Sequence, residues 1–280
     1  MSDQVHVALL QLRTPADQKA ALAHVEPLLR EAAQAGAEFI ATPEATNILE
    51  RDRAKLFERL EPAERDPCVQ GMIALARELR VWLLIGSALV KRPDGGAANR
   101  SMLVDPTGRI VATYDKIHMF DVDLPTGERA RESEAYTPGC SASIAQTPFG
   151  CLGLSVCYDV RFPYLYRALA KAGAEILTIP SAFTRPTGEA HWEILLRARA
   201  IENGAFVLAP AQGGRHQDGR GTWGRSMVIG PWGDILGQAL DDEPGVVSAV
   251  LDRDAPAKAR AAIPSLANER AFTGPMALAR

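Results

Sequence analysis

Apolar residues follow two patterns along the chain. Some segments are continuous or alternating apolar runs, as in strands, and others repeat every three or four positions, as in amphipathic helices. Strands are predicted at 5–12, 38–42, 81–90, 175–181, 205–212 and 245–252, helices at 16–37, 67–80, 163–174 and 190–204, and strand pairs at 100–115, 141–157 and 225–240. This alternation predicts an α/β fold, and the hairpins add antiparallel pairing, so the sheets should be mixed.

No part of the chain has the composition of a linker between domains. The sequence contains no run rich in glycine or serine, no internal repeat and no low-complexity segment. A single domain over residues 1–280 is therefore predicted. Periodicity weakens after Pro264, so 264–280 is interpreted as a C-terminal tail, which could pack on a partner subunit.

Composition and charge narrow the class of protein. Acidic and basic residues are mixed, and the formal net charge is only −3, which favours neither nucleic acid nor a membrane surface as partner. The N-terminus lacks a signal-peptide pattern, and no apolar run is long enough to span a bilayer. The four cysteines form no CxxC pair and are too sparse for a disulfide framework. A cytoplasmic, reduced enzyme or binding protein is expected.

Three chemically useful side chains follow predicted strands. Glu44 comes after 38–42, Lys116 follows the hairpin 100–115, and Cys157 ends the strand pair 141–157. Since ligands bind beyond the carboxyl ends of strands in open α/β sheets, the three could converge. A carboxylate could take the thiol proton, and an ammonium could stabilise both the thiolate and an oxyanion. Such a set would suit acyl transfer from an amide or nitrile through a thioester.

The same three residues also have purely structural interpretations. Cys157 shares the small-residue face of its strand with Cys151, and buried cysteines more often fill space than attack substrates. Glu44 could cap a helix or lie on the surface, and Lys116 could be a solvated lysine. The residue pattern alone therefore leaves the catalytic group as a hypothesis.

Three sequence blocks carry a family resemblance. They are "ATPEATN" around Glu44, "YDKIHMFDVD" around Lys116 and "GLSVCYDVRFP" around Cys157. In this order and at these separations they resemble the signature blocks of the nitrilase superfamily of carbon–nitrogen hydrolases. The resemblance implies a four-layer α-β-β-α sandwich with two mixed sheets. It also implies a homodimer, a small-molecule amide substrate, and no metal or organic cofactor.

The resemblance also implies roles for individual residues. Cys157 would be the nucleophile and Glu44 the base, while Lys116 and the backbone N–H of Tyr158 would hold the oxyanion. The proposed reaction hydrolyses an amide to an acid and ammonia through a thioester.

A second glutamate usually lies between the lysine and cysteine blocks of this superfamily. The segment "RESEAYTPG" places it at Glu132, with Glu134 as the poorer match. Ala130 stands where relatives often carry an aromatic residue, so this loop could be looser here.

Later segments narrow the branch of the superfamily. Residues 179–216 and 224–236 most resemble the deaminated-glutathione amidases, and "AQGGRH" favours that branch. The neighbouring omega-amidases, which act on α-ketoglutaramate-type amides, are the alternative. N-carbamoyl amino acid amidohydrolases and true nitrilases are less similar. Both leading branches imply a terminal amide on a small substrate that bears a carboxylate.

A carboxylate-bearing substrate calls for a cationic partner in the site. Arg161, four residues past Cys157, could bind the carboxylate, or it could form a structural ion pair. Phe183, Arg185 and Thr187 follow the strand 175–181 and could line the pocket, or they could belong to a surface loop.

Two other classes of protein compete with this assignment. A metal-dependent hydrolase could use His118, Asp121 and Asp123, but no HExxH spacing accompanies them. A non-catalytic binding protein could keep the same fold without needing the reactive thiol.

Overall fold

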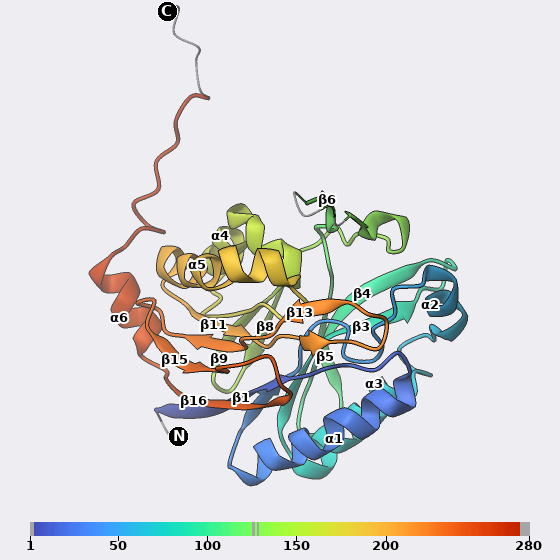
Figure 1. The fold of residues 1–280 in the computed structure, drawn as a ribbon. Coiled ribbons are helices and arrows are strands. Elements are labelled where there is room, and N and C mark those ends of the chain that lie inside the picture. Colours follow the sequence, from blue (N-terminus) through green and yellow to red (C-terminus); the bar gives the residue numbers. More distant parts are fainter. Residues whose placement is uncertain (1–2, 125–126, 128, 275–280) are drawn as a thin grey trace, which may run out of the picture.

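Two mixed six-stranded sheets form the centre of the molecule in the computed structural model, which describes residues 3–124, 127 and 129–274 (Figure 1). The first sheet has the order β16-β1-β2-β3-β4-β5 and the second the order β15-β14-β11-β10-β9-β8. In each sheet the central strands, β1-β2-β3 and β9-β10-β11, pair in parallel, and the outer strands pair antiparallel. The predicted mixed sheets are confirmed.

The strand bounds follow the apolar runs closely. The first sheet comprises β1 (Gln4–Gln11), β2 (Phe39–Ala41), β3 (Trp82–Lys91), β4 (Ala97–Val104), β5 (Ile110–Asp115) and β16 (Gly245–Asp252). The second comprises β8 (Ser143–Thr147), β9 (Gly150–Leu154), β10 (Ile176–Thr178), β11 (Phe206–Ala209), β14 (Met227–Ile229) and β15 (Ile235–Gln238).

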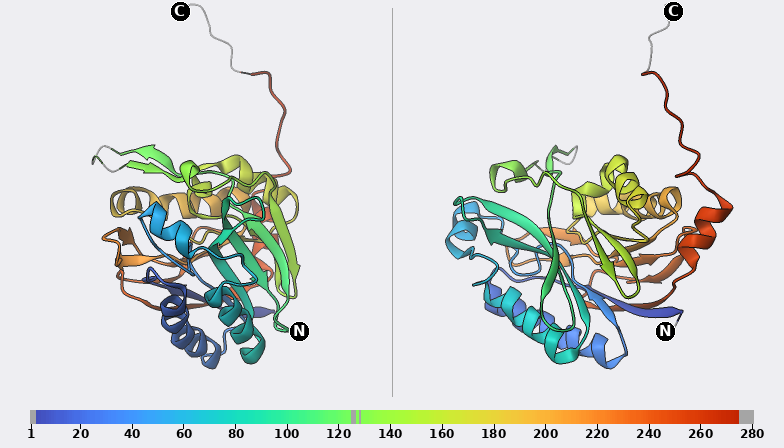
Figure 2. Two further views of the ribbon diagram at one scale, coloured as in Figure 1. Left: turned by 90° about the vertical axis from the view of Figure 1, so that its right-hand side faces the viewer. Right: turned by 180° about the vertical axis from the view of Figure 1, so that it is seen from behind.

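Helices cover the outer face of each sheet. The helices α1 (Gln18–Gln34) and α3 (Pro67–Leu79) lie on the first sheet, and α4 (Pro163–Lys171) and α5 (Arg185–Asn203) lie on the opposite side of the molecule (Figure 2). The layers therefore run helix, sheet, sheet, helix, which confirms the predicted α-β-β-α sandwich. Two shorter helices, α2 (Arg53–Arg59) and α6 (Ala255–Ala262), lie outside these layers.

Strand β1 alternates polar and apolar residues at its start and becomes continuously apolar over residues 7–10. Val7 and Leu9 belong to the core that lies between the sheets, whereas Ala8 and Leu10 pack in the core beneath α1 and α3. A strand that is buried on both faces cannot carry the polar half of an alternating pattern. Burial on both faces is thus the physical origin of the run that predicted this strand.

Helix boundaries depend on local capping. Asp17 accepts a hydrogen bond from the N–H of Ala20 at 2.9 Å at the start of α1, and Asp66 accepts two backbone N–H bonds at the start of α3. Helix α5 begins at Arg185, five residues before the predicted start at 190, because a proline in its first turn has the backbone φ of a helix already.

Several short elements were not predicted. They are the hairpin β6 (Asp121–Asp123) and β7 (Arg129–Arg131), the hairpin β12 (Gly213–Arg215) and β13 (Gly221–Trp223), the helices α2 and α6, and the 3₁₀ turns η1 (Glu132–Glu134) and η2 (Cys157–Arg161). The strands of these two hairpins are three residues long and mostly polar or glycine-rich, unlike the equally short but apolar β2, β10 and β14, so no hydrophobic pattern marks them.

The predicted tail, 264–280, is described as far as residue 274. The described part contains neither helix nor strand and projects from the body of the molecule beyond α6 (Figure 1). Its first residues are attached to α4, because Arg167 donates to the carbonyl of Ser265 at 3.1 Å and pairs with Glu269 at 3.3 Å. Within the described ranges, none of the helices combines the length and the apolar character needed to cross a membrane.

Candidate active site

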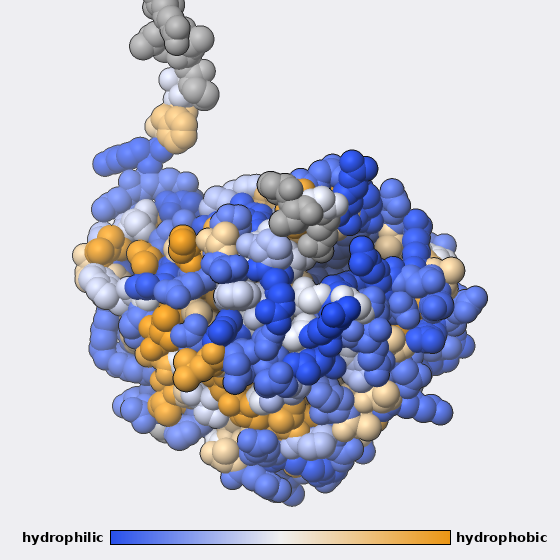
Figure 3. All heavy atoms as spheres, in the orientation of Figure 1, coloured by the Kyte–Doolittle hydropathy of each residue, from blue (hydrophilic) through white to orange (hydrophobic). Residues whose placement is uncertain are grey.

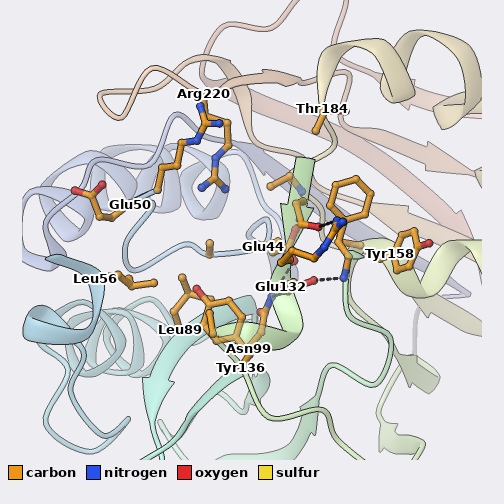
Figure 4. Close-up of a pocket in the computed structure, with 18 of the residues that line it drawn as sticks. Glu44, Glu50, Leu56, Leu89, Asn99, Glu132, Tyr136, Tyr158, Thr184 and Arg220 are labelled. Carbon is orange, nitrogen blue, oxygen red and sulfur yellow. Dashed lines mark hydrogen bonds between the residues drawn. The ribbon is translucent and has the colours of Figure 1, made fainter. Parts of the chain in front are cut away.

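A cavity of about 650 Å³ is lined by residues that follow strands of both sheets (Figure 4). Glu44 comes after β2 and Lys116 directly after β5 in the first sheet, while Cys157 comes after β9 in the second. All three line this cavity together with Glu132 and Asn99. The convergence expected from strand ends is therefore present, and it occurs between the two sheets.

Lys116 is the central charge of the cavity wall. Its side chain is 2 % exposed, and Nζ lies 2.9 Å from Glu44 Oε1. Both carboxylate oxygens of Glu132 also bind Nζ, at 2.9 and 2.8 Å. The lysine is thus a buried cation held by two carboxylates and is not a solvated surface residue. Glu134 lines the same cavity, but its carboxylate lies 3.8 Å from Arg53 instead.

Cys157 is held in a tight turn after its strand. Its φ is +51°, in the left-handed region that non-glycine residues rarely adopt, and its N–H donates to the carbonyl of Pro180 at 2.9 Å. Such conformations cluster at functional sites because the surrounding structure must hold them in place. The turn presents the thiol to Glu44, to which it is hydrogen-bonded. Cys151, in the middle of β9, is buried and lies outside the cavity.

Burial and neighbouring charges set the protonation of the thiol and the carboxylate. Burial, together with the charge of Glu44, raises the pKa of Cys157 well above its usual value, although Lys116 opposes this shift. Burial also disfavours the charged form of Glu44, but the Lys116 charge and hydrogen bonds from Lys116, Cys157 and Asn99 hold its pKa below the usual value. The resting pair is therefore a neutral thiol beside an ionised carboxylate.

The ammonium of Lys116 stays charged for the complementary reason. Burial alone would lower its pKa, but the carboxylates of Glu132 and Glu44 raise the pKa well above its usual value. A buried cation next to the thiol is a fixed positive charge that can stabilise an oxyanion.

Residues without a predicted role hold Glu44 and Glu132 in place. Asn99, on β4, donates to Glu44 at 2.9 Å and to Glu132 at 3.2 Å. Gln212 donates to the backbone carbonyl of Glu44 at 2.9 Å, and the N–H of Ala182 donates to Glu44 Oε2 at 2.9 Å. An asparagine inside a mostly small and apolar strand, "AANRSMLV", was the available signal, because a buried amide needs partners.

Asp159 joins the lysine block to the cysteine block. Its buried carboxylate accepts hydrogen bonds from Tyr114 Oη at 2.7 Å, from the N–H of Val156 at 2.8 Å and from the N–H of His118 at 3.1 Å. Tyr114 belongs to β5, which leads into Lys116, and Val156 precedes Cys157. One carboxylate therefore holds both segments at a fixed separation.

The four predicted substrate-binding residues divide into two groups. Phe183 and Thr187 line the cavity. Arg161 lies outside the lining, where its guanidinium packs over the rings of Tyr158 and Phe183, and Nη2 lies 3.3 Å from His191. Arg185 also lies outside the lining and forms an ion pair with Asp242. Neither of these two arginines therefore belongs to the cavity wall.

Tyr158, the predicted source of an oxyanion-binding N–H, also contributes its side chain to the cavity lining. Its ring packs edge-on against Phe120 and Phe162, at centroid distances of 5.1 and 5.3 Å. Ala130, where an aromatic residue was noted as absent, lines the cavity from β7.

The residues considered for a metal site have separate partners. His118 Nδ1 lies 2.7 Å from Asp159, Asp121 accepts from the N–H of Ser133 at 3.0 Å, and Asp123 pairs with Arg131 at 2.7 Å. The described part of the chain contains no group of three histidine, cysteine or acidic side chains arranged to hold a metal ion.

The fold is an α-β-β-α sandwich, and its cavity holds a buried thiol hydrogen-bonded to a carboxylate, with a buried ammonium beside them. This combination defines a thiol-dependent hydrolase. The carbon–nitrogen hydrolase family model matches residues 6–261. This chain belongs to the carbon–nitrogen hydrolase family. The predicted membership of the nitrilase superfamily and the predicted hydrolysis of carbon–nitrogen bonds are confirmed.

Individual relatives agree with this family. A protein named deaminated glutathione amidase from Yersinia enterocolitica is 44% identical over 248 residues, which cover 88% of this chain and 85% of the relative. Nit3 of Saccharomyces cerevisiae, a nitrilase superfamily member, aligns with a TM-score of 0.83 and 28% identity, covering 94% of this chain and 96% of Nit3. A variant amidase from Nesterenkonia sp. AN1, solved with acrylamide added to its active-site cysteine, has a TM-score of 0.75 and 27% identity, with coverages of 93% and 98%.

Proposed function

We propose that this thiol-dependent amidase hydrolyses an amide of a small carboxylate-bearing substrate, with Cys157 as nucleophile, Glu44 as general acid and base, and Lys116 as oxyanion partner. The observation that carries this proposal is the contact of a neutral thiol and an ionised carboxylate at one cavity, with a buried ammonium bonded to that carboxylate. Three groups of this kind meeting in a cavity are the requirements of nucleophilic acyl transfer.

The first half of the reaction forms a thioester. Glu44 takes the thiol proton as the Cys157 sulfur attacks the carbonyl carbon of the substrate. Lys116 and the N–H of Tyr158 stabilise the oxyanion of the tetrahedral intermediate. The carbon–nitrogen bond then breaks, and the proton held by Glu44 passes to the departing amine or ammonia.

The second half of the reaction releases the acid. Glu44 deprotonates a water molecule, which attacks the thioester carbon, and the Cys157 sulfur leaves and recovers the proton. Glu132 keeps Lys116 in position through both halves. These side chains supply the nucleophile, the proton transfers and the oxyanion charge, so the proposed cycle uses no metal or organic cofactor.

We propose deaminated glutathione as the substrate, because a relative named deaminated glutathione amidase is 44% identical to this chain over 248 residues. The cavity of about 650 Å³ lies in the size range of sites that enclose small organic ligands. Phe183 and Thr187 are proposed to contact the substrate from the cavity wall. The alternative substrates are α-ketoglutaramate-type amides, which are smaller.

We also propose that the chain forms a homodimer. Apolar side chains gather over β15 and β16 on the face shown in Figure 3. Ile235 on β15 and Val250 on β16 are among the exposed apolar residues, at 40% and 42%. An exposed apolar patch of this kind is typical of a protein interface. Ile235→Glu should turn a dimer into a monomer in light scattering, and a wild-type monomer at all concentrations would exclude the dimer.

Residues 1–280 are proposed to act as one domain with a tail at 264–280, and a cytoplasmic location is proposed because a nucleophilic thiol must remain reduced. Limited proteolysis that yields one resistant core, and cell fractionation, test these two statements.

Turnover of deaminated glutathione, α-ketoglutaramate and an N-carbamoyl amino acid, measured side by side, tests the function. We expect the highest kcat/KM on deaminated glutathione, no turnover by Cys157→Ala and near wild-type turnover by Cys151→Ala. Equal loss in the two cysteine variants would refute the assignment of the nucleophile. Absence of turnover across all amides would support a binding protein on this fold.

A further inference from the structure

The cavity extends well beyond the reacting groups. In Figure 4, Glu44 and Glu132 lie near the middle of the view, Tyr158 lies on one side, and Arg220 and Glu50 lie on the other. The lining on that second side comes from residues 50–53 of the first half of the chain and residues 219–221 of the second. The catalytic groups therefore occupy only part of the cavity, and the rest has room for a remote part of the substrate.

Arg220 stands on a rigid part of this second side. It follows a tight turn in which the N–H of His216 donates to the carbonyl of Arg220 at 2.8 Å and Asp218 accepts from the N–H of Arg220 at 2.9 Å. This turn joins β12 to β13, and the N–H of Trp223 donates to the carbonyl of Phe183 at 2.9 Å. The Arg220 backbone is thus fixed relative to the cavity wall that Phe183 also forms.

The guanidinium of Arg220 is free to bind a further anion. Its ion pair is with Asp218, at 3.4 Å, and its side chain is 34% exposed. That carboxylate oxygen, Asp218 Oδ2, makes no hydrogen bond within the described residues. The contact is therefore a long ion pair that leaves the donors of the guanidinium fork available.

The other arginines that line the cavity are arranged differently. Arg53 lies 3.8 Å from Glu134, and Arg129 and Arg131 both pair with Asp123, at 3.2 and 2.7 Å. Arg51 is exposed at the rim. Arg220 is thus set apart by its fixed backbone and its half-buried position.

Glu50, an acidic residue on this side of the cavity, is also already engaged. Glu50 accepts the N–H of Asp52 at 2.8 Å and lies 3.8 Å from Arg59. These contacts reduce the repulsion that Glu50 would exert on an incoming carboxylate.

Tyr136 offers a second hydrogen-bond donor to the cavity. It lines the cavity, and within the described ranges its hydroxyl makes no hydrogen bond. Burial and the charge of Glu132 raise the pKa of this phenol, and Arg220 acts in the opposite direction, so both charges reach it. A neutral hydroxyl without a protein partner therefore lines the same cavity as the carboxylates and the guanidinium, where it can donate to a substrate oxygen.

We propose that Arg220 and Tyr136 form a second anion site, which binds a carboxylate on the arm of the amide substrate remote from the scissile bond. The site rests on the proposed function and determines which amides are preferred: those long enough to carry a second carboxylate to Arg220. A guanidinium binds a carboxylate through two parallel hydrogen bonds, which fixes the orientation of that arm as well as its charge.

Steady-state kinetics on a matched substrate pair test the site. The pair is deaminated glutathione, with its glycine carboxylate free, and the methyl ester of that carboxylate. For Arg220→Gln we expect KM for the free acid to rise about 10- to 100-fold, as for loss of charged hydrogen bonds, with kcat within about twofold. KM for the ester should not change. Tyr136→Phe should raise KM for the free acid about fivefold, as for one neutral hydrogen bond.

Arg215→Gln is the control, because Arg215 is exposed on β12 of the same hairpin and lies outside the cavity lining. It should leave both KM values unchanged. If Arg220→Gln raises KM equally for the acid and the ester, or raises neither KM, the proposed anion site is refuted.

A binding measurement separates this site from the proposed reaction. Acrylamide, which is neutral, would alkylate Cys157, and the free acid should protect the thiol at lower concentration than the ester does. Arg220→Gln should abolish that difference while the rate without ligand stays the same. If acid and ester protect the wild-type thiol equally, the anion site is refuted, whether or not either compound is hydrolysed. If the acid protects but is not turned over, the proposed substrate fails and the anion site stands.

Discussion

Glu132 binds Lys116 through both of its carboxylate oxygens, at 2.9 and 2.8 Å from Nζ. The same carboxylate accepts the N–H of Phe120 at 2.6 Å, so it is itself held in place. Lys116 is thereby fixed next to Glu44 with no freedom to rotate toward solvent. A preorganised cation stabilises a developing oxyanion without reorganising during the reaction, and this is where Glu132 should contribute to rate.

Glu132→Gln should therefore lower kcat and leave KM nearly unchanged. An amide keeps one acceptor oxygen for Lys116 but replaces the other by an NH₂ group that faces the ammonium or the Phe120 N–H. We expect a loss of about 100-fold in kcat, comparable with removal of one oxyanion donor. Steady-state kinetics on the preferred amide measure the loss.

Glu134→Gln is the matched control on the same 3₁₀ turn. Glu134 is exposed and lies near Arg53, away from Lys116, so its variant should keep near wild-type kcat. Equal losses in the two variants would mean that the loop as a whole, and not the Lys116 contact, determines the rate.

The pH dependence should follow from the neutral thiol and the ionised carboxylate. The pKa of Glu44 is depressed, so the base form persists from neutral pH down to below the usual carboxyl range. The pKa of Cys157 is raised, so the thiol stays protonated above the usual thiol range of about 8.5. Since this protonation state is the reactive one, kcat/KM should be flat from about pH 6 to pH 9 and fall only in more acidic solution.

Alkylation of Cys157 by acrylamide gives an independent check of that state. A free thiolate would make the alkylation rate rise tenfold per pH unit below about 8.5. Here the rate should stay level across that range, because Glu44 takes the proton during attack. Glu44→Gln should slow alkylation strongly, and a tenfold rise per unit in the wild type would contradict the neutral resting thiol.

Asp159 should act as a positioning residue. Asp159→Asn exchanges one acceptor oxygen for an NH₂ group that faces the donors Tyr114 Oη, the Val156 N–H or the His118 N–H. Leaving a buried donor unpaired costs about 1–3 kcal/mol, so the free energy of unfolding should fall by roughly that amount. Because the carboxylate also sets the separation of Lys116 and Cys157, kcat should fall more than KM rises.

The matched control for Asp159 is Asp121→Asn, since Asp121 is exposed and bonds Ser133. Urea unfolding and kinetics at one pH compare the two variants. If Asp159→Asn loses stability but keeps kcat at a temperature where it is fully folded, its role is structural only.

The sequence predicted the layers and the convergence of Glu44, Lys116 and Cys157 at one cavity, because both leave strong local patterns. Residues 7–10 of β1 are continuously apolar since they are buried on both faces, and Cys157 lies just after its strand ends. The contacts of Asn99 and Gln212 could not be predicted, because they join Glu44 to residues 55 and 168 positions away. Sequence spacing says nothing about such distant partners.

The predicted cationic partners illustrate the same limit. Arg161 is close to Cys157 in sequence, but its guanidinium packs over two aromatic rings outside the cavity lining. Arg220 lies 63 positions after Cys157 in the numbering and reaches the cavity only because the β12–β13 turn folds back over it. The direction of a long side chain depends on packing that one sequence does not reveal.

His216 should make stability depend on pH. Its ring is buried in the turn that carries Arg220, with Nε2 2.7 Å from Thr222 Oγ1, and burial lowers its pKa to about 4. In the unfolded chain the pKa is about 6.5, so between these values the unfolded state binds a proton that the folded state does not. Stability is therefore complete above about pH 6.5 and is lost as the pH falls toward 4.

The loss from His216 should amount to roughly 2 kcal/mol between pH 7 and pH 5. Urea unfolding of the wild type and of His216→Gln at both pH values measures this contribution of His216. Carboxylates that titrate in the same range affect both proteins alike and cancel in the comparison. The difference in unfolding free energy between pH 7 and pH 5 should be smaller in His216→Gln by that amount. The exposed His191 provides the comparison, and His191→Gln should keep the wild-type difference. If His216→Gln kept the wild-type difference in unfolding free energy between pH 7 and pH 5, the wild-type ring would have to be protonated inside the folded turn. The turn beneath Arg220 would then carry an additional charge.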